Sequence, residues 1–223
     1  MIAEVRGQAA TLVVRDRAGQ REMVAQDAEG EMVWTRVALD DPARSGWPYV
    51  DLLHLAATRA RRRRRALFVG LGGGVAMRQF ARTYPGIRLD VVERDPMVVA
   101  LARAHFRLDD IPQLRVVVED GARFVRRAPA AHWDVVVVDA YDAGRPAADM
   151  AQRPFFAALH RATRPGGAVA INLVSALDAP SLGQLVHRLS RRFDDVRLAP
   201  VVVANERYRA DARRNVVVTA VRR

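Results

Sequence analysis

The stretch Ala66-Leu-Phe-Val-Gly-Leu-Gly-Gly-Gly74 decides the fold of this chain. Its four apolar residues predict a buried strand, and its glycines predict a tight turn into the helix that follows. Such a turn lets a ligand approach the backbone and the N–H groups at the start of the helix. A dinucleotide-binding fingerprint needs a third glycine where Val75 stands, so the spacing disfavours a dinucleotide.

Downstream of this loop, apolar runs alternate with amphipathic segments. Near-continuous Val, Ile and Leu runs are typical of parallel strands that helices cover on both faces. We therefore expect an α/β fold with a doubly wound, mostly parallel, seven-stranded sheet of the Rossmann-like methyltransferase type. The expected strands are 66–69, 89–92, 114–118, 133–138, 168–171, 200–204 and 215–219, and the expected helices include 95–106, 153–163 and 179–193.

The first 48 residues follow a different pattern. Apolar runs at 11–15 and 22–25 flank the turn residues Asp16-Arg-Ala-Gly19, which predicts a β-hairpin, and 31–38 is a third candidate strand. Helical spacing begins at Tyr49. We therefore expect a small N-terminal β domain, residues 1–48, followed by a Rossmann-like domain, residues 49–223.

Composition limits the possible functions. The chain has 223 residues, a net charge of +11 and no cysteine, which excludes disulfides, thiolate metal sites and a cysteine nucleophile. All basic residues are arginines spread along the chain, so GC-rich codon usage explains the charge better than nucleic-acid binding does. A nucleic-acid partner is disfavoured but stays open. No apolar run is long enough to cross a membrane, no secretory leader is evident, and we expect a cytoplasmic protein.

Carboxylates follow the next two expected strands at the point where each ends. Glu93 can accept hydrogen bonds from both hydroxyls of a ribose. Asp120 can accept one from an adenine amino group, with Gly121 leaving room for the ring, and it can also cap the following helix. Because parallel strands end at one edge of a sheet, these groups should face one crevice. The glycine spacing G-x-G-x-G suits an S-adenosylmethionine-like ligand there.

The sequence Asp139-Ala-Tyr-Asp142 follows the fourth expected strand. Two carboxylates three residues apart can attract a cationic amine and accept its proton. An amine attacks a sulfonium-bound carbon only as the free base, so a positioned carboxylate assists that reaction. An isolated pair of this kind is also compatible with a simple turn held by side-chain hydrogen bonds.

Together these motifs resemble the spermidine synthase (polyamine aminopropyltransferase) family. The resemblance covers residues 66–172 and includes the helix and turn at 153–167. Its motifs are the glycine loop, Val92-Glu-Arg-Asp95, Glu119-Asp-Gly121, and Asp139-Ala-Tyr-Asp142 followed by Pro146-Ala147. Upstream, Tyr49-Val-Asp51 resembles another element of the family.

The resemblance implies roles for individual residues. Asp139 would be the base or amine-orienting acid, Asp142 would bind the cationic acceptor, and Tyr49 would help shape the donor and acceptor site. These three residues form the implied catalytic set, and Asp51 would bind the substrate together with Asp142 and Tyr49. The residues implied to hold S-adenosylmethionine or its decarboxylated form are Gly70, Gly72, Gly73, Gly74, Glu93, Asp120 and Gly121. The resemblance also implies a small-molecule amine as acceptor and a homodimer. The histidines have no metal-ligand spacing, so we expect no metal.

Two departures from the family pattern keep the function open. Gly73 stands where the family has an aspartate that contacts the terminal amine of the decarboxylated donor, and Ala140-Tyr141 replaces Ser-Ser. A glycine N–H would instead suit the carboxylate of intact S-adenosylmethionine. Three functions remain. The family implies aminopropyl transfer to an amine first; methyl transfer from intact S-adenosylmethionine and nucleoside binding without turnover are the alternatives.

Charge is an obstacle for a cationic acceptor, because the whole chain is strongly basic. Acids near the site would have to outweigh that positive field. Physiological salt screens charges beyond about 8 Å, so nearby acids can do so. The acids expected to do so are Asp40, Asp41, Asp139, Asp142 and Asp149. Trp34 and Trp47 are interpreted as core or domain-interface residues. Asn172 stands where many family members carry glutamine.

Overall fold

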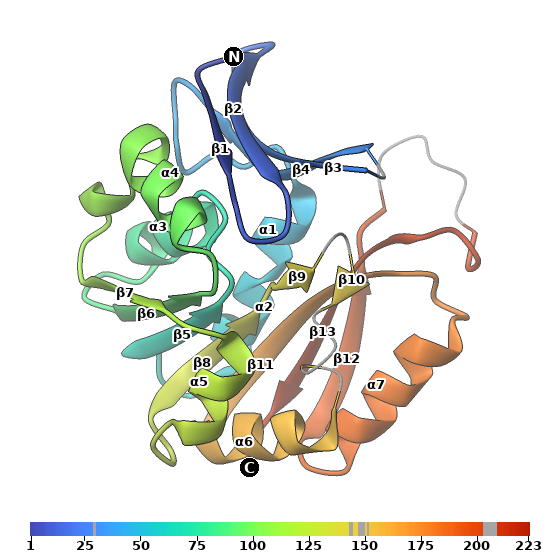
Figure 1. The fold of residues 1–223 in the computed structure, drawn as a ribbon. Coiled ribbons are helices and arrows are strands. Elements are labelled where there is room, and N and C mark those ends of the chain that lie inside the picture. The colour runs from blue at the N-terminus through green and yellow to red at the C-terminus, as the bar shows by residue number, and fades with distance from the viewer. Residues whose placement is uncertain (29, 143–144, 147–149, 151, 203–208) are drawn as a thin grey trace.

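The computed structural model describes residues 1–223 apart from 29, 143–144, 147–149, 151 and 203–208, and the side chains of 141–142 and 145–146 also lie outside the description. A seven-stranded sheet with the order β12-β13-β11-β8-β5-β6-β7 forms its larger part (Figure 1). Its strands are β5 (Arg65–Val69), β6 (Arg88–Glu93), β7 (Leu114–Val118), β8 (Trp133–Val138), β11 (Thr163–Ser175), β12 (Asp194–Pro200) and β13 (Arg214–Val221).

Strand directions and helix positions confirm the predicted doubly wound architecture. Strands β5, β6, β7, β8 and β11 pair in parallel, and β13 runs antiparallel to β11 and β12. Helices α2 (His54–Arg59), α3 (Val75–Thr83) and α4 (Pro96–Phe106) share one core cluster with Phe68 of β5. Helices α5 (Gly121–Arg127), α6 (Arg153–Ala162) and α7 (Pro180–Ser190) share the other with Leu67. Neighbouring residues of β5 therefore face opposite helix layers.

A four-stranded antiparallel sheet precedes this fold and lies above it in the view of Figure 1. Its strands are β1 (Ala3–Arg6), β2 (Thr11–Arg17), β3 (Gln20–Asp27) and β4 (Gly30–Ala38). The predicted hairpin is confirmed: Ala18 and Gly19 join β2 to β3 with φ of +51° and +75°, which suits a tight two-residue turn. Leu12 and Met23 are fully buried in the same cluster as Phe68. The division of the chain at residue 48 stays a prediction.

Several expected boundaries were wrong. The strand expected at 200–204 is β12, which ends at Pro200, and residues 203–204 lie outside the description. This edge strand is only partly buried, so it lacks the continuous apolar run of a central strand. The helix expected from Tyr49 divides into α1 (Pro48–Leu52) and α2. Strand β1 and the short pair β9 (Tyr141–Asp142) and β10 (Arg145–Pro146) were not predicted.

No helix in the described part of the chain is both long and apolar enough to span a membrane. The cytoplasmic location and the homodimer stay predictions. Within the same described residues, no cluster of three or more His, Cys, Asp or Glu side chains has the arrangement of a metal site.

Candidate active site

A cavity of about 620 Å³ lies at the carboxyl ends of β5, β6, β7 and β8, with residues of β4 on its opposite side. Most of the predicted site residues line it: Tyr49, Gly70, Gly72, Gly73, Glu93, Asp120, Gly121 and Asp139. Residues far apart in the sequence thus meet at one edge of the sheet. Gly74 does not line the cavity; it caps α3 with a φ of +79°. Asp142 belongs to β9, but its side chain lies outside the described residues.

Two glycines of the loop occupy positions that other residues tolerate poorly. Gly70 has a φ of +102°, and a Cβ there would overlap the backbone carbonyl of Asp139. Gly72 has a φ of +52°, and its Cβ would overlap the hydroxyl of Thr35. The glycines therefore permit close approach of β8 and β4 to the loop, which brings Asp139 and Thr35 to the same cavity.

Glu93 ties the end of β6 to the glycine loop. Its Oε2 accepts a hydrogen bond from the Leu71 N–H at 3.1 Å, and its Oε1 accepts one from the Asp95 N–H at 3.0 Å. Burial raises the pKa of Glu93, while these N–H donors and that of Arg94 act in the opposite direction. These backbone donors fix the carboxylate in place at the edge of the cavity. Its role toward a ribose stays a prediction.

Asp120 caps α5, one of the roles considered for it. Its Oδ1 accepts a hydrogen bond from the Arg123 N–H at 2.7 Å. A Cβ on Gly121 would lie 2.5 Å from Cγ1 of Val69 and 2.8 Å from Cε of Met150, so this glycine permits tight packing of α5 on β5. Both residues line the cavity as well, so capping leaves contact with a ligand open.

Asp139 has the most developed surroundings of the predicted acids. Its Oδ2 accepts a hydrogen bond from the Tyr49 hydroxyl at 3.2 Å, and its Oδ1 accepts one from Nδ2 of Asn172 at 2.9 Å. Burial raises the pKa of Asp139, and these two donors offset part of that rise. Asn172 is buried, and its Oδ1 has no hydrogen-bond partner among the described residues. The carboxylate of Asp139, which two donors hold, thus lies beside the Asn172 oxygen, which accepts no hydrogen bond from the described residues. This arrangement suits a ligand that carries N–H groups.

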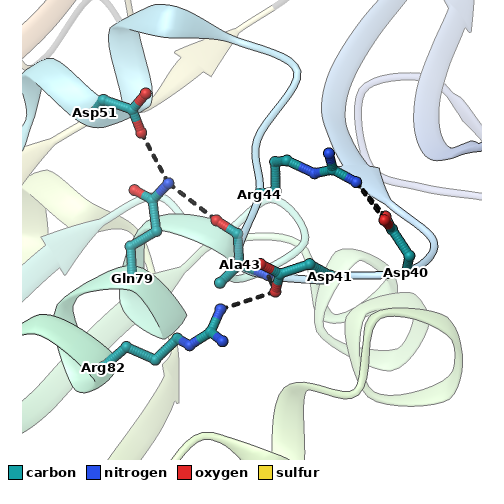
Figure 2. Close-up of polar contacts among 7 residues, drawn as sticks. All are labelled: Asp40, Asp41, Ala43, Arg44, Asp51, Gln79 and Arg82. Atoms are coloured by element: carbon teal, nitrogen blue, oxygen red, sulfur yellow. Dashed lines mark hydrogen bonds and ion pairs between the residues drawn. The ribbon is translucent and has the colours of Figure 1, made fainter.

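Asp51 was expected to bind substrate, but it lies outside the cavity lining and is exposed on α1 (Figure 2). Its Oδ1 accepts a hydrogen bond from Nε2 of Gln79 at 2.9 Å. The same amide nitrogen donates to the carbonyl of Ala43 at 3.0 Å, which fastens the loop after β4 to α3. In this position Asp51 supports the loop that leads to Tyr49.

Of the acids expected to attract a cationic acceptor, Asp139 lines the cavity, while Asp149 and the side chain of Asp142 lie outside the described part of the structure. Asp40 pairs with Arg44 at 2.6 Å and Asp41 pairs with Arg82 at 2.8 Å, and neither acid lines the cavity (Figure 2). Within each of these exposed pairs, the arginine and the carboxylate neutralise each other's charge. The acids among the described lining residues are Glu93, Asp95, Asp120 and Asp139, and the arginines are Arg36, Arg94 and Arg213. The excess positive charge of the chain is therefore not concentrated at the cavity.

Sequence reasoning missed the β4 side of the cavity. Trp34, Thr35 and Trp47 line it, and both tryptophans also pack against the hydrophobic core, as interpreted from the sequence. Thr35 is buried, and its Oγ1 accepts a hydrogen bond from the Gly73 N–H at 2.8 Å. The glycine N–H expected to meet a donor carboxylate is therefore already used within the chain. No local pattern marks a contact between residues 38 positions apart.

The sequence model of the spermine/spermidine synthase domain matches residues 49–201, more than half of the chain. This chain belongs to the spermine/spermidine synthase family. The expected resemblance is thereby confirmed.

Curated relatives carry out two kinds of transfer, as their names state. Putrescine N-methyltransferase 1 of Nicotiana tabacum is 35% identical over 147 residues, which are 63% of this chain and 39% of that protein. Spermidine synthase 2 of Arabidopsis thaliana is 32% identical over 122 residues, which are 53% of this chain and 36% of that protein. The matched part is thus well under half of the length of these relatives.

Solved structures agree on the fold. A probable spermidine synthase from Corynebacterium glutamicum ATCC 13032 superposes with a TM-score of 0.85 at 17% identity, covering 99% of this chain and 80% of that chain. Human methyltransferase-like protein 13, in complex with SAH, gives a TM-score of 0.63 at 19% identity over 79% of this chain and 83% of that chain. The Rossmann-like methyltransferase fold predicted from the sequence is confirmed.

Proposed function

We propose that this chain transfers the methyl group of intact S-adenosylmethionine to a small-molecule amine. The observation that carries the proposal is the surroundings of Gly73. A Cβ at this position would lie 2.5 Å from Cγ2 of Thr35 and 2.8 Å from Cδ1 of Phe106, so an acid has no room there. The aspartate that would hold the terminal amine of a decarboxylated donor is thus absent, and its place is filled. The similarity to putrescine N-methyltransferases supports the same choice.

Strand order supports one orientation of the donor. Adjacent strands in the order β8-β5-β6-β7 carry Asp139, the glycine loop, Glu93 and Asp120 at their ends. With adenine at Asp120 and ribose at Glu93, the sulfonium lies toward the glycine loop and the methyl group toward Asp139. An acceptor amine beside Asp139 then approaches the methyl carbon from the side away from sulfur, as in-line displacement requires.

The chemistry assigned to the chain is proton removal and positioning. The amine nitrogen forms a bond to the methyl carbon, the carbon–sulfur bond breaks, and its electron pair stays on sulfur as a neutral thioether. The proton lost by the amine passes to the carboxylate of Asp139. A carboxylate whose pKa burial raises accepts a proton more readily than an exposed one, and such assistance is worth roughly 10²–10⁴-fold.

Aminopropyl transfer from the decarboxylated donor is the second candidate. The family match favours it, since the matched domain is named for spermine and spermidine synthases. The same Asp139 and Tyr49 would serve it, because an amine also attacks a sulfonium-bound carbon in that reaction. The two candidates differ in the donor, so donor preference separates them.

Calorimetric titration with S-adenosylmethionine, its decarboxylated form and methylthioadenosine tests the proposal. We expect tighter binding of the intact donor, and methyl transfer to a panel of primary diamines when the intact donor is supplied. Tighter binding of the decarboxylated form with aminopropyl transfer would establish the second candidate. Binding of none of the three nucleosides would overturn both.

Tyr49→Phe should move the acid limb of the pH profile of kcat/KM to higher pH. The Tyr49 hydroxyl donates to Asp139 and lowers its pKa, so its loss leaves the carboxylate protonated up to a higher pH. A protonated carboxyl group cannot accept the proton of the amine. Rate measurements across the acid range test this, with His54→Gln, which alters a residue outside the cavity lining, as the control. An acid limb that stays in place would remove Asp139 from the titration that limits the rate.

A further inference from the structure

An irregularity in β4 lies in the part of the strand that lines the cavity. Val24 pairs with Val33 and Met23 pairs with Thr35, so Trp34 is an extra residue between two paired positions. Such a bulge breaks the alternation of side chains between the two faces of a strand and re-aims one of them. Trp34 and Thr35 line the cavity together with their strand neighbours Met32, Val33 and Arg36.

Both residues carry a hydrogen-bond donor that the described part of the chain does not use. The Thr35 oxygen accepts from the Gly73 N–H, and no described residue accepts its hydroxyl proton. The indole Nε1 of Trp34 is buried and has no partner among the described residues. Buried donors rarely stay unpaired, because each one loses its bond to water without a replacement. Two adjacent unused donors therefore indicate an acceptor group supplied from outside the described residues.

The location of these donors restricts that acceptor group. Thr35 contacts Gly72 and Gly73, the loop beside which the sulfonium is placed in the proposed function. The nearest cation on the same strand, Arg36, is engaged by Glu22 at 2.6 Å and stacks on Trp47 at 4.8 Å from the ring centroid. A donor tail ending in an ammonium needs acceptors, whereas a tail ending in a carboxylate needs donors. Trp34 and Thr35 supply donors.

We propose that the bulged segment Trp34-Thr35 binds the carboxylate of the donor's amino-acid tail and so selects intact S-adenosylmethionine over its decarboxylated form. This inference rests on the proposed function and names the residues that decide its donor. Thr35 Oγ1 accepts a hydrogen bond from the Gly73 N–H and donates its own proton to the carboxylate. Trp34 Nε1 donates a second hydrogen bond to the same carboxylate. Hydrogen bonds to a charged acceptor are the stronger kind, so two of them can decide between donors that share every other group.

Thr35→Val and Trp34→Phe test the inference, since each removes one donor; valine keeps the shape of threonine, and phenylalanine keeps an aromatic ring. The ligands are S-adenosylmethionine and S-adenosylhomocysteine, which carry the carboxylate, and decarboxylated S-adenosylmethionine and methylthioadenosine, which lack it. We expect each variant to weaken the first two by roughly tenfold and to leave the last two within about twofold. Thr35→Ser keeps the hydroxyl and should bind like the unaltered chain.

A merely structural role gives a different pattern. If Thr35 only holds the Gly73 N–H, its replacement by valine weakens all four nucleosides equally, which would overturn the inference. Unchanged binding of all four ligands by both variants would also overturn it, while leaving the proposed function standing. Failure of the unaltered chain to bind any nucleoside would instead remove the proposed function on which the inference rests. Thermal unfolding of each variant verifies that it is folded before titration.

Discussion

Asp139→Asn is expected to lower kcat by roughly 10²–10⁴-fold while S-adenosylmethionine still binds. Asparagine has the shape of aspartate and can still accept from Asn172, but it cannot take a proton from an attacking amine. Single-turnover methyl transfer measures the chemical step, and calorimetric titration measures donor binding. Full turnover by the variant would exclude Asp139 as the proton acceptor.

The same substitution should raise the melting temperature at neutral pH. Burial raises the pKa of Asp139 in the folded chain, so the folded state binds the proton more tightly than the unfolded state does. The ionised carboxylate therefore costs folding free energy above that raised pKa, and no such cost exists below the pKa of the unfolded chain. Asparagine, which does not ionise, removes the cost.

Asp134→Asn is a matched control at the other end of β8. Oδ2 of Asp134 accepts hydrogen bonds from the N–H groups of Arg64 at 2.8 Å and Arg65 at 3.0 Å, and Oδ1 lies 3.4 Å from Arg164. An amide there loses the attraction to Arg164, so this variant should melt at a lower temperature and keep near-normal kcat. A lower melting temperature for both variants would show that the carboxylate of Asp139 stabilises the fold instead of costing folding free energy.

Gly70→Ala is expected to destabilise the fold by at least about 3 kcal/mol, since it combines an unfavourable backbone angle with a steric overlap. The φ of +102° disfavours any residue with a Cβ, and the overlapping atom is the backbone carbonyl of Asp139, which cannot rotate away. The end of β8 would have to move, and Asp139 with it. Urea denaturation of the purified variant, or its loss from the soluble fraction, measures the effect.

Gly86→Ala separates the two causes. Gly86 also has a positive φ, +79°, but a Cβ there meets no atom within 4 Å. It should cost only the strain of the left-handed conformation, about 1–2 kcal/mol. Equal destabilisation by the two substitutions would mean that contact between the glycine loop and β8 contributes nothing.

The central sheet and its binding edge could be predicted because the signals are local. Residues 135–138 of β8 are valines buried on both faces, so the strand appears as a continuous apolar run. Its end is marked by the change to Asp139. The same change marks the ends of β6 and β7, and parallel pairing then brings those ends together. Local pattern and topology were therefore sufficient to predict that Glu93, Asp120 and Asp139 lie at the same edge of the sheet.

The β4 side of the cavity could not be predicted, because it depends on register. The pairing of β4 contains an extra residue opposite Met23 and Val24, and no single-strand pattern reveals which residue is extra. The position of Asp51 had a similar origin. Its motif resembles a family element, yet its partner is Gln79 on another helix, and that pairing follows only from packing.

The shared core of the two sheets limits how this sequence can diverge. Leu12, Val14 and Met23 are fully buried in the same core cluster as Val98 and Phe106 of α4 rather than in a compartment of their own, and β2 packs against α4. Because protein interiors are close-packed, a larger side chain on one partner requires a smaller one on the other. Mutations in the N-terminal strands are therefore tied to compensating mutations in α4, and relatives that differ in one should differ in the other.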